Sequence, residues 1–525
     1  MIRLRQIKVL VGKNNLKEEI SKKLKINISD ILNIKIIKKS IDARFKPQLY
    51  YVYEVDIQVT REDIILKKIS SNDIFKAPIE EYYFQANGKL QLNNRPVIVG
   101  SGPAGLFCAY MLSEYGYKPL IIERGSDVDT RIEKVKRFWK DNILDTECNV
   151  QFGEGGAGTF SDGKLNTLIK DKDFRMKKVF EIFVENGAPS DIMYENKPHI
   201  GTDILVDVVR NMRKKIIANG GEMRFNTKLT DINCCDNKIT GVVVNDEEKI
   251  GCNCLILAIG HSARDTFKML YDKKIIMQPK PFAIGVRIQH PQSLINHNQY
   301  GIDDVNLPSA SYKLTHTCQN GRGVYTFCMC PGGYVVNSSS ENQMLAINGM
   351  SYHARDSKIA NSAVIVTVNP NDFGNHPLDG MKWQQELEKR TYQVGNGLIP
   401  VQLFKDFINN KPSEKLGSIK PMFKGNYKLS NLNMIFPNYI NESLKEGIIA
   451  MDKKIKGFAS DDAILAAIES RTSSPIRIVR DDNYEASVKG IYPIGEGAGY
   501  AGGITSSAMD GIKIAEAIMS KYNNE

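Results

Sequence analysis

The fold of this chain is decided by residues 95–125, RPVIVGSGPAGLFCAYMLSEYGYKPLIIERG. An apolar run at 97–99 enters a glycine-rich turn, an apolar-periodic segment follows, and a second apolar run at 120–122 ends on Glu123. This order predicts a strand, a helix and a second strand of a Rossmann-like unit. The turn at 100–105 matches G-x-G-x-x-G, which indicates a dinucleotide site when a strand precedes it and a helix follows.

Each residue type in this turn has a physical role. Gly100 permits the tight turn, Gly102 lets a pyrophosphate approach the backbone, and Gly105 lets the helix pack on the strand. The helix N-terminus then offers free N–H groups and a positive dipole end to the phosphates. Glu123 stands where a carboxylate accepts both ribose hydroxyls and repels a 2′-phosphate, which disfavours NADP. The motif alone does not separate FAD from NAD.

A second signal lies near the end of the chain, at 491–518, IYPIGEGAGYAGGITSSAMDGIKIAEAI. It predicts a short strand, a Gly-Glu-Gly turn and a helix of small residues that begins at Gly503. Such a turn suits the ribityl phosphate region of a flavin, and the helix N-terminus suits the pyrimidine edge, where negative charge collects. Two half-sites about 400 residues apart indicate a long ligand that spans the fold. This favours FAD over NAD.

The chain of 525 residues is too long for one ordinary core. We predict an α/β protein in which a Rossmann-like FAD-binding domain carries an inserted mixed α+β substrate domain and follows a small N-terminal α+β domain. The predicted boundaries are 1–92 for the small domain, 93–261 and 456–525 for the FAD-binding domain, and 262–455 for the insert.

Local patterns support this division. Residues 202–218 have apolar residues at spacing four and predict a helix, 222–229 a strand, and 238–252 a hairpin. The second half of an FAD domain has this order, whereas an NAD dehydrogenase continues with repeated βα units. Residues 60–94 are predicted to be mainly linker, and 461–469 to be a helix where the chain returns from the insert.

Composition sets the class of protein. Hydrophobic residues make up 42% and charged residues 25% of the chain, typical of a globular protein, and no apolar run is long enough to span a membrane. Nine scattered cysteines favour a reduced, cytoplasmic location. Residues 1–92 hold 18 Lys and Arg against 11 Asp and Glu, and thus +7 of the net +10. A solvated basic surface explains this charge more simply than nucleic-acid binding, which stays open.

An unusual stretch, NVQFGEGGAGTFSDGKLNT, occupies 149–167. It contains a second G-x-G-x-x-G match at 153–158, but no apolar strand precedes it and Ser-Asp-Gly at 161–163 breaks any following helix. We reject it as a second nucleotide site. A loop with so few large side chains suits backbone contact with a flat ligand, and a plain flexible loop is the alternative.

With these stretches in view, the chain resembles a largely uncharacterised family of bacterial FAD-dependent dehydrogenases. They belong to the glutathione-reductase-like flavoprotein superfamily, on the branch with fumarate reductase flavoproteins and geranylgeranyl reductases. The resemblance covers essentially the whole chain and rests on VIVGSGPAGLFCAYML, VQFGEGGAGTFSDGKLNT, TFCMCPGGYVVNSSSE, ESRTSSPIRI and IYPIGEGAGYAGGITSSAMDG. It implies an FAD oxidoreductase without naming a substrate.

The resemblance also implies the residues that hold FAD. They are Gly100, Gly102, Pro103, Ala104 and Gly105 at the pyrophosphate, Glu123 and Arg124 at the ribose, Leu229 near adenine, Gly156, Ser161, Gly163 and Lys164 along the isoalloxazine, Ala258 and Gly260 on the return strand, and Gly495, Glu496, Gly503 and Ile504 at the C-terminal turn. Glu496 departs from the Asp of many superfamily members, which puts that contact in doubt. No Cys-x-x-x-x-Cys follows the first helix, so disulfide reductase chemistry is excluded. No second nucleotide unit lies between 125 and 490, so hydride comes from the substrate or from transiently bound NAD(P)H.

Candidates for catalysis are sparse, and each has a structural alternative. A flavin enzyme needs a path for hydride and usually a proton donor or base. Arg287, His290, Arg355 and Arg471 are candidates for holding an anionic substrate. Cys328 and Cys330 stand before two glycines and are either reactive or simply buried. We also note His261, which either covers the flavin or is a loop residue, and we predict no metal site.

Three functions remain open. The first is a cytoplasmic FAD oxidoreductase that acts on an unidentified small molecule. The second is a flavin-dependent enzyme that modifies nucleic acid, which the basic residues 1–92 suggest. The third is a redox flavoprotein that docks a protein partner through residues 1–92.

Overall fold

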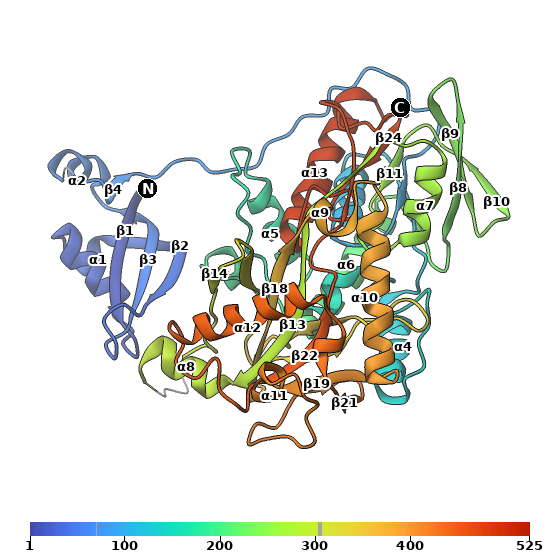
Figure 1. Ribbon diagram of the computed structural model, residues 1–525. Helices are drawn as coiled ribbons and strands as arrows, with labels where there is room; N and C mark the ends of the chain where they lie inside the picture. Colours follow the sequence, from blue (N-terminus) through green and yellow to red (C-terminus); the bar gives the residue numbers. More distant parts are fainter. Residues whose placement is uncertain (70, 303–306, 525) are drawn as a thin grey trace.

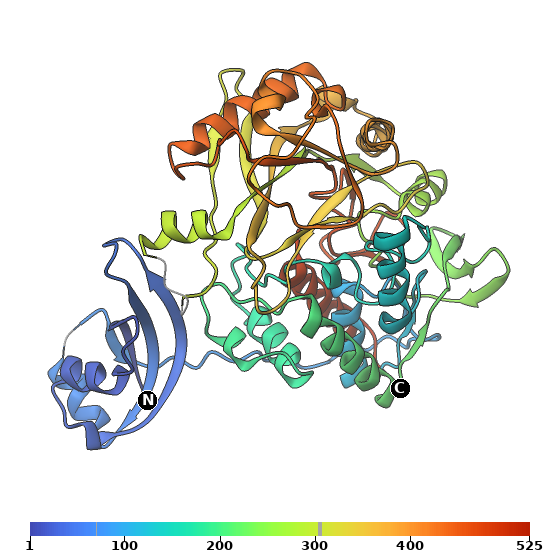
Figure 2. The same cartoon turned by 90° about the horizontal axis from the view of Figure 1, so that it is seen from below.

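The computed structural model describes residues 1–69, 71–302 and 307–524. An N-terminal lobe lies to one side of the molecule, and the rest of the chain forms a dinucleotide-binding region and a region built on a larger sheet (Figures 1 and 2). The N-terminal lobe approaches the larger sheet near β14 and α8 (Figure 1).

The dinucleotide-binding region is built on a parallel sheet with strand order β24-β11-β5-β6-β7. Its strands are β5 (Val97–Val99), β6 (Leu120–Ile122), β7 (Glu222–Arg224), β11 (Leu255–Leu257) and β24 (Ile491–Pro493). The apolar runs of β5, β6 and β11 are buried, as expected for parallel strands covered on both faces. The strand near the end of the chain pairs with β11, so the predicted Rossmann-like fold is confirmed.

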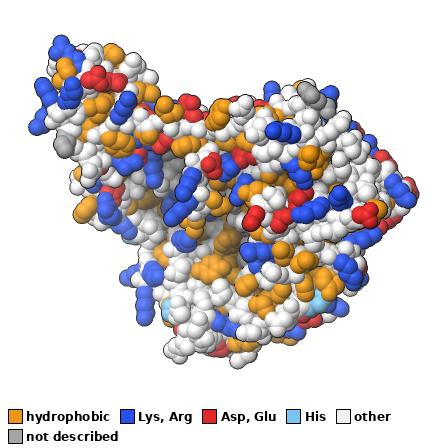
Figure 3. Space-filling view, turned by 90° about the horizontal axis from the view of Figure 1, so that it is seen from above, with side chains coloured by type: hydrophobic (Ala, Val, Ile, Leu, Met, Phe, Trp, Pro, Cys, Tyr) orange, Lys and Arg blue, Asp and Glu red, His pale blue; other side chains and the backbone are white. Residues whose placement is uncertain are grey.

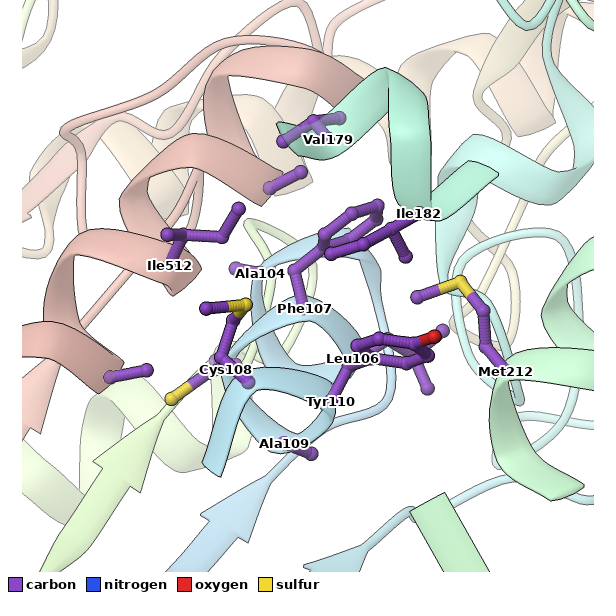
Figure 4. Packing of buried hydrophobic residues seen from close by; sticks show 14 of the residues in the cluster. Ala104, Leu106, Phe107, Cys108, Ala109, Tyr110, Val179, Ile182, Met212 and Ile512 are labelled. Carbon is purple, nitrogen blue, oxygen red and sulfur yellow. The ribbon is translucent and has the colours of Figure 1, made fainter. Parts of the chain in front are cut away.

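Helix α3 (Pro103–Glu114) lies at the centre of this region. Ten of its twelve residues are buried, which is typical of a helix enclosed by its neighbours. It packs against α5 (Arg175–Glu185), α6 (Thr202–Ala218) and α13 (Ile504–Lys521), as Figure 4 shows. The contact with α13 is close, because a Cβ on Gly511 would lie 2.2 Å from the carbonyl oxygen of Ala104.

A separate antiparallel sheet with order β10-β9-β8 lies beside this region. It contains β8 (Leu229–Cys235), β9 (Lys238–Val244) and β10 (Glu248–Gly251). The predicted hairpin matches β9 and β10. The strand predicted at 222–229 is divided, because β7 ends at Arg224 and β8 begins at Leu229 in a different sheet. Strands β12 (Met277–Pro279) and β23 (Ile476–Ile478) form a further antiparallel pair.

The larger sheet has the order β14-β15-β18-β13-β22-β19-β21. Its strands are β13 (Phe282–Pro291), β14 (Thr315–Thr317), β15 (Gly323–Cys330), β18 (Ile359–Val368), β19 (Ile399–Leu403), β21 (Tyr427–Leu429) and β22 (Ile464–Glu469). A small sheet joins β16 (Tyr334–Asn337), β17 (Ile347–Met350) and β20 (Phe423–Lys424). Helices α10 (Asp379–Gly395) and α12 (Asn438–Asp452) pack against the larger sheet.

The helix predicted at 461–469 is wrong. Residues Ile464–Glu469 form β22, which pairs with β13 on one side and β19 on the other. All six residues are buried, so both faces of the strand are covered. A strand of this kind has no alternation of polar and apolar residues, and its short apolar run is ambiguous in the sequence.

The N-terminal lobe is a sheet with order β2-β3-β1-β4 and two helices. Its elements are β1 (Ile2–Leu10), α1 (Leu16–Leu24), β2 (Ile31–Asp42), β3 (Tyr50–Val59), α2 (Glu62–Lys68) and β4 (Ile74–Lys76). The predicted linker at 60–94 therefore contains α2 and β4, and β4 pairs with β1. The extended chain that follows crosses the body beside the end of α13, where the Gly88 N–H donates to the Met519 carbonyl oxygen at 3.0 Å.

The remaining α-helices among the described residues are α4 (Val128–Asp141), α7 (Arg264–Asp272), α8 (Gln292–Tyr300), α9 (Pro370–Phe373) and α11 (Phe404–Ile408). Short 3₁₀ turns lie at Ile28–Asp30, Ala157–Phe160, Ser190–Met193 and Leu432–Met434. Across 1–69, 71–302 and 307–524, no helix has both the length and the apolar character that crossing a bilayer requires.

Candidate functional site: a glycine-lined cradle and a polar cleft

The glycine turn has the geometry of a nucleotide-binding turn. Gly100 has φ +99°, and a Cβ there would lie 2.4 Å from the Ala258 carbonyl oxygen. A Cβ on Gly105 would lie 2.0 Å from the Gly100 carbonyl oxygen. Both positions therefore require glycine, the first for its conformation and the second for close packing. Pro103 is the first residue of α3, a position where its missing N–H costs nothing.

Two distant segments come to this turn. The loop at 153–158 approaches Gly102, since a Cβ on Gly156 would lie 2.8 Å from the Gly102 Cα. The C-terminal turn approaches α3, since a Cβ on Gly495 would lie 2.7 Å from the Ala104 Cβ. Both approaches depend on glycine. The stretches that the sequence singled out at 100–105, 153–158 and 495–504 are thus brought together by the fold.

Open space lies beside these backbones. A Cβ on Gly260 or Gly502 would meet no atom within 4 Å, and one on Gly102 would meet only the Gly156 Cα, at 3.8 Å. Gly503 precedes α13 with φ +137°, so the helix N-terminus begins at this space. Bare backbone and helix N-termini around an open volume suit a phosphate-containing flat ligand. The residues present therefore fit FAD.

Glu123 is buried and fully engaged. One carboxylate oxygen accepts the N–H of Ser101 at 2.9 Å and its hydroxyl at 2.7 Å, and the other accepts the N–H groups of Gly125 at 2.9 Å and Gly153 at 3.0 Å. Its acceptor sites therefore fasten the glycine turn to the 153–158 loop. Arg124 is held by Glu147 and Asp265. The ribose roles of both residues stay predictions.

Several partly exposed polar side chains, including His261, Glu496, Lys164 and Arg355, lie beside the cradle, and we call this group the polar cleft. His261 follows Gly260, and its Nδ1 lies 2.5 Å from Oε1 of Glu496. Its Nε2 is buried, and among the described residues it has no hydrogen-bond partner. Glu469 interacts electrostatically with His261, and burial raises the pKa of its carboxyl against the opposing effect of Arg287. An imidazole that contacts one carboxylate and interacts electrostatically with a second, with one nitrogen unused, is a group that can hold or transfer a proton.

A second group in the cleft is built on the glycine-rich loop. Asp162 is buried and forms an ion pair with Arg355, and it accepts a hydrogen bond from the Ser351 hydroxyl. Lys164 Nζ lies 3.8 Å from the Asp162 carboxylate. The chain at 163–165 pairs with 198–200, where Lys164 and His199 form an antiparallel bridge.

The two candidate cysteines differ in their surroundings. The register of β15 shifts between Phe327 and Cys330, and Cys328 adopts φ +40°. Cys328 is exposed and Cys330 is buried. Burial nevertheless raises the pKa of the Cys328 thiol to about 12, although Arg287 and Lys164 lower it. The Cys328 thiol is therefore accessible to solvent but harder to ionise than an ordinary cysteine.

Arg287 is a buried residue that contacts several members of the cleft. It has no exposed surface, and its guanidinium donates to Glu469 at 2.7 Å, to the Cys328 carbonyl oxygen at 3.1 Å and to the side chains of Asn361 and Asn348. These acceptors engage Nε and both terminal nitrogens of the Arg287 guanidinium. Arg287 therefore holds the Cys328 backbone in place, and its contact with a substrate stays a prediction.

Two other candidates are also buried. His290 has no exposed surface, its Nε2 lies 2.7 Å from the Phe458 carbonyl oxygen, and burial lowers its pKa to about 4. Arg471 binds both oxygens of Glu388 at 2.8 and 2.9 Å and the hydroxyls of Ser262 and Ser340. The guanidinium of Arg471 is thus engaged within the protein, whereas Nδ1 of His290 is buried and has no hydrogen-bond partner among the described residues. The substrate-binding roles of both residues stay predictions.

The remaining predicted residues lie around the cradle. The Ser161 hydroxyl donates to the Gly158 carbonyl oxygen at 2.7 Å. Gly163 has φ +67°. Leu229 is buried at the start of β8, and Ile504 begins α13 beside Gly158.

Sequence reasoning missed several residues of the cleft. Asp162 lies within the glycine-rich stretch 149–167. A carboxylate between the small residues Ser161 and Gly163 could have indicated a site residue. Glu469 opens the quoted stretch ESRTSSPIRI but was not chosen as a site residue. Lys197 and the stacked pair His199 and His353, whose ring centroids lie 5.2 Å apart, follow no motif. Only the pairing of distant segments reveals them.

A group of metal-ligating types lies elsewhere, on β14 and α12. His316, Cys318 and Glu446 have ligand atoms within 4.8 Å of one another. His316 Nε2 lies 3.0 Å from the Glu446 carboxylate, and the Cys318 thiol donates to the Ser443 carbonyl oxygen at 3.5 Å. Each side chain thus has a partner within the protein.

The parallel sheet, the glycine turn and the cradle define a Rossmann-type flavoprotein. Residues 281–472 match a family described as "FAD-dependent protein, C-terminal domain-like", 98–153 match an "NAD(P)-binding Rossmann-like domain", and 1–58 match a "Domain of unknown function". An "Uncharacterized protein" of Clostridium beijerinckii is 50% identical over 517 residues, which cover 97% of this chain and 96% of that protein. The chain belongs to this family of uncharacterised FAD-dependent proteins, and its cofactor is FAD.

Solved structures show only a distant likeness. A quinol fumarate reductase from E. coli is 11% identical, with 83% of this chain and 70% of that chain covered and a TM-score of 0.33. A glycine oxidase from Bacillus cereus is 10% identical, with 82% and 96% covered and a TM-score of 0.34. Likeness at this level does not bear on the reaction.

Proposed function

We propose that this flavoprotein is an oxidoreductase that transfers hydride between flavin N5 and a small molecule bound in the polar cleft. One observation carries the proposal: the polar side chains of the cleft belong to the same loops whose glycines form the cradle. Lys164 follows Gly156 in one loop, His261 follows Gly260, and His261 pairs with Glu496 of the C-terminal turn. Bound FAD would supply the hydride acceptor or donor.

The side chains of the cleft supply the proton chemistry in this proposal. His261 Nδ1 is oriented by the Glu496 carboxylate, and its unpartnered Nε2 is left to give or take a proton. Glu469 adds a buried carboxylate that the Arg287 guanidinium holds in place and that interacts electrostatically with His261. Cys328 remains a neutral thiol because its pKa is high.

The test is anaerobic bleaching of the bound flavin by a panel of metabolites that includes NADH and NADPH. We expect at least one compound to bleach the flavin of the wild-type protein. We expect His261→Gln to retain FAD but to react more slowly, by about 10²-fold or more if His261 is the acid or base. A flavin that no panel compound reduces would contradict the proposal, as would equal rates for the variant.

The cysteines support the proposed cytoplasmic location. All nine are free, as expected in a reducing compartment.

A further inference from the structure

Three polar side chains share one face of the cleft, and a fourth lies beside them. Residues 163–165 pair with 198–200 through the bridge of Lys164 with His199, and two further backbone bonds join Leu165 to Pro198 and Ile200 to Gly163. Alternate residues of extended chain point to the same side. Lys164 and His199 are directly paired and face the same side, and Lys197, two residues before His199, faces that side too. Asp162 is placed beside them by its ion pair with Lys164.

Positive charge on this face exceeds negative charge. Asp162 is the shared partner of Arg355 and Lys164. Lys197 Nζ has a neutral partner, the Ser311 hydroxyl at 3.0 Å. Lys197 is an exposed residue, and partial desolvation of its ammonium together with the nearby charges of Lys164 and Arg355 lowers its pKa. Three cations around one carboxylate repel each other, and a bound anion would remove that repulsion.

Neighbouring acids are engaged elsewhere. Asp203 accepts the His353 N–H at 2.8 Å, and Glu195 pairs with Lys39 of the N-terminal lobe at 2.7 Å. Glu195 is thus already paired with a cation outside the cluster. Lysine and arginine side chains also surround a hollow near the N-terminal lobe (Figure 3).

The cluster is continuous in sequence with the cradle and interacts electrostatically with the cysteines. Asp162 and Lys164 continue the loop that approaches the glycine turn through Gly156. Lys164 also interacts electrostatically with Cys328 and Cys330. A ligand held here would therefore extend toward the open space of the cradle.

We propose that Lys164, Lys197 and Arg355 bind an anionic group of the substrate, a carboxylate or a phosphate. Arg355 uses Nε and one terminal nitrogen for Asp162, so its planar fork is fixed in orientation before the ligand arrives. Lys164 and Lys197 contribute point charges from the two paired segments, 163–165 and the chain that leads into 198–200. The inference rests on the proposed function, because it assumes that the compound bound in this cleft is the one that reacts.

Isothermal titration of the FAD-loaded protein with sodium succinate and with sodium phosphate, at constant ionic strength set by sodium chloride, tests the inference. We expect saturable binding of at least one of these anions, and the anion that binds identifies a carboxylate or a phosphate site. Lys197→Gln should weaken that binding about tenfold or more. Lys268→Gln, which changes an exposed lysine on α7, should leave it unchanged.

Two results would overturn the inference: no saturable binding of either anion, or equal binding by the wild-type and Lys197→Gln proteins. The bleaching experiment separates this inference from the proposed function. If anion binding depends on Lys197 but no panel compound reduces the flavin, the anion site is supported and the proposed oxidoreductase activity is refuted. Bleaching only by uncharged compounds, at a rate that Lys197→Gln does not change, would refute the anion site alone.

Discussion

Glu123 shows how a residue expected at a ligand can also fasten the fold. The sequence predicts a ribose acceptor, whereas the structure shows a buried carboxylate that already accepts four hydrogen bonds from Ser101, Gly125 and Gly153. The carboxylate thus joins the glycine turn to the loop that covers it. Loss of these bonds is expected to affect both stability and FAD binding.

Glu123→Gln should lower the free energy of unfolding by about 1–3 kcal/mol, because an amide NH₂ would face buried donors that the carboxylate satisfied. Urea unfolding of the apoprotein measures this, with FAD occupancy as the second readout. Glu147→Gln, which alters an exposed surface partner of Arg124, is the control. A change below about 0.5 kcal/mol for Glu123→Gln would show that these bonds contribute little.

Cys328 is accessible but should react slowly. Burial raises its thiol pKa from 9.0 to about 12, and only the thiolate is a nucleophile. At pH 8 we expect iodoacetamide to modify Cys328 at least about tenfold more slowly than exposed Cys235. Peptide mass spectrometry over time reports both rates. Modification of Cys328 as fast as Cys235 would contradict this prediction.

Among the elements, α7 and α10 are joined through a buried ion network. Glu388 on α10 is bound by Arg264 of α7 and by Arg471, which follows β22, at 2.8–2.9 Å. Burial acts to raise the pKa of Glu388, but the two arginines outweigh it and hold that pKa far below 4.5. The network ties the FAD-binding region to the larger sheet.

Glu388→Gln should destabilise the protein by about 3–5 kcal/mol, because two buried arginines lose a shared anion. The pH dependence has a definite sign. A carboxyl whose folded pKa is lowered stabilises the fold above its unfolded pKa, and that stability is lost as the pH falls below about 4.5. The urea midpoint of the wild type should therefore decrease on acidification more than that of the variant. Parallel curves would contradict this assignment.

The elements also show what the sequence could predict. The βαβ unit was predictable because apolar runs, glycines and a terminal acid occur in one continuous stretch. The strand β22 was not, because a short run buried on both faces has no period that separates strand from helix. Arg287, His290 and Arg471 were chosen for their chemistry, but burial and partners decide their roles. Lys197 enters the cleft only through pairing with 163–165, which no local pattern encodes.

For the whole molecule, contacts from a few residues hold the N-terminal lobe against the body. Two backbone hydrogen bonds join it to the body, from Lys39 N–H to the Tyr194 carbonyl oxygen and from Asn196 N–H to the Lys39 carbonyl oxygen, each 2.8 Å. Leu49 packs into the hydrophobic core of the larger sheet. Arg3 of the lobe pairs with Asp56, so part of its basic charge is neutralised. These contacts set the lobe beside the segment that carries Lys197.

Leu49→Asp should detach the lobe, because a carboxylate would replace a side chain that is only 2% exposed. Leu32→Asp is the matched control, since Leu32 is 59% exposed in the same lobe. Small-angle scattering should show a larger radius of gyration for Leu49→Asp alone. Equal radii for the two variants would show that the core contact of Leu49 does not hold the lobe.

The most direct test of the account is the FAD content of Gly102→Ala. The added Cβ would meet only the Gly156 Cα at 3.8 Å, an ordinary contact, and Gly102 has a common extended conformation with φ −70°. The apoprotein should therefore fold normally, while the methyl group blocks the approach of the pyrophosphate. Gly323→Ala on β15, where the nearest atom is at 3.6 Å, is the control. We predict wild-type thermal stability of the apoproteins, with FAD lost from Gly102→Ala and retained by Gly323→Ala. Full FAD occupancy in Gly102→Ala would contradict the placement of FAD on this turn.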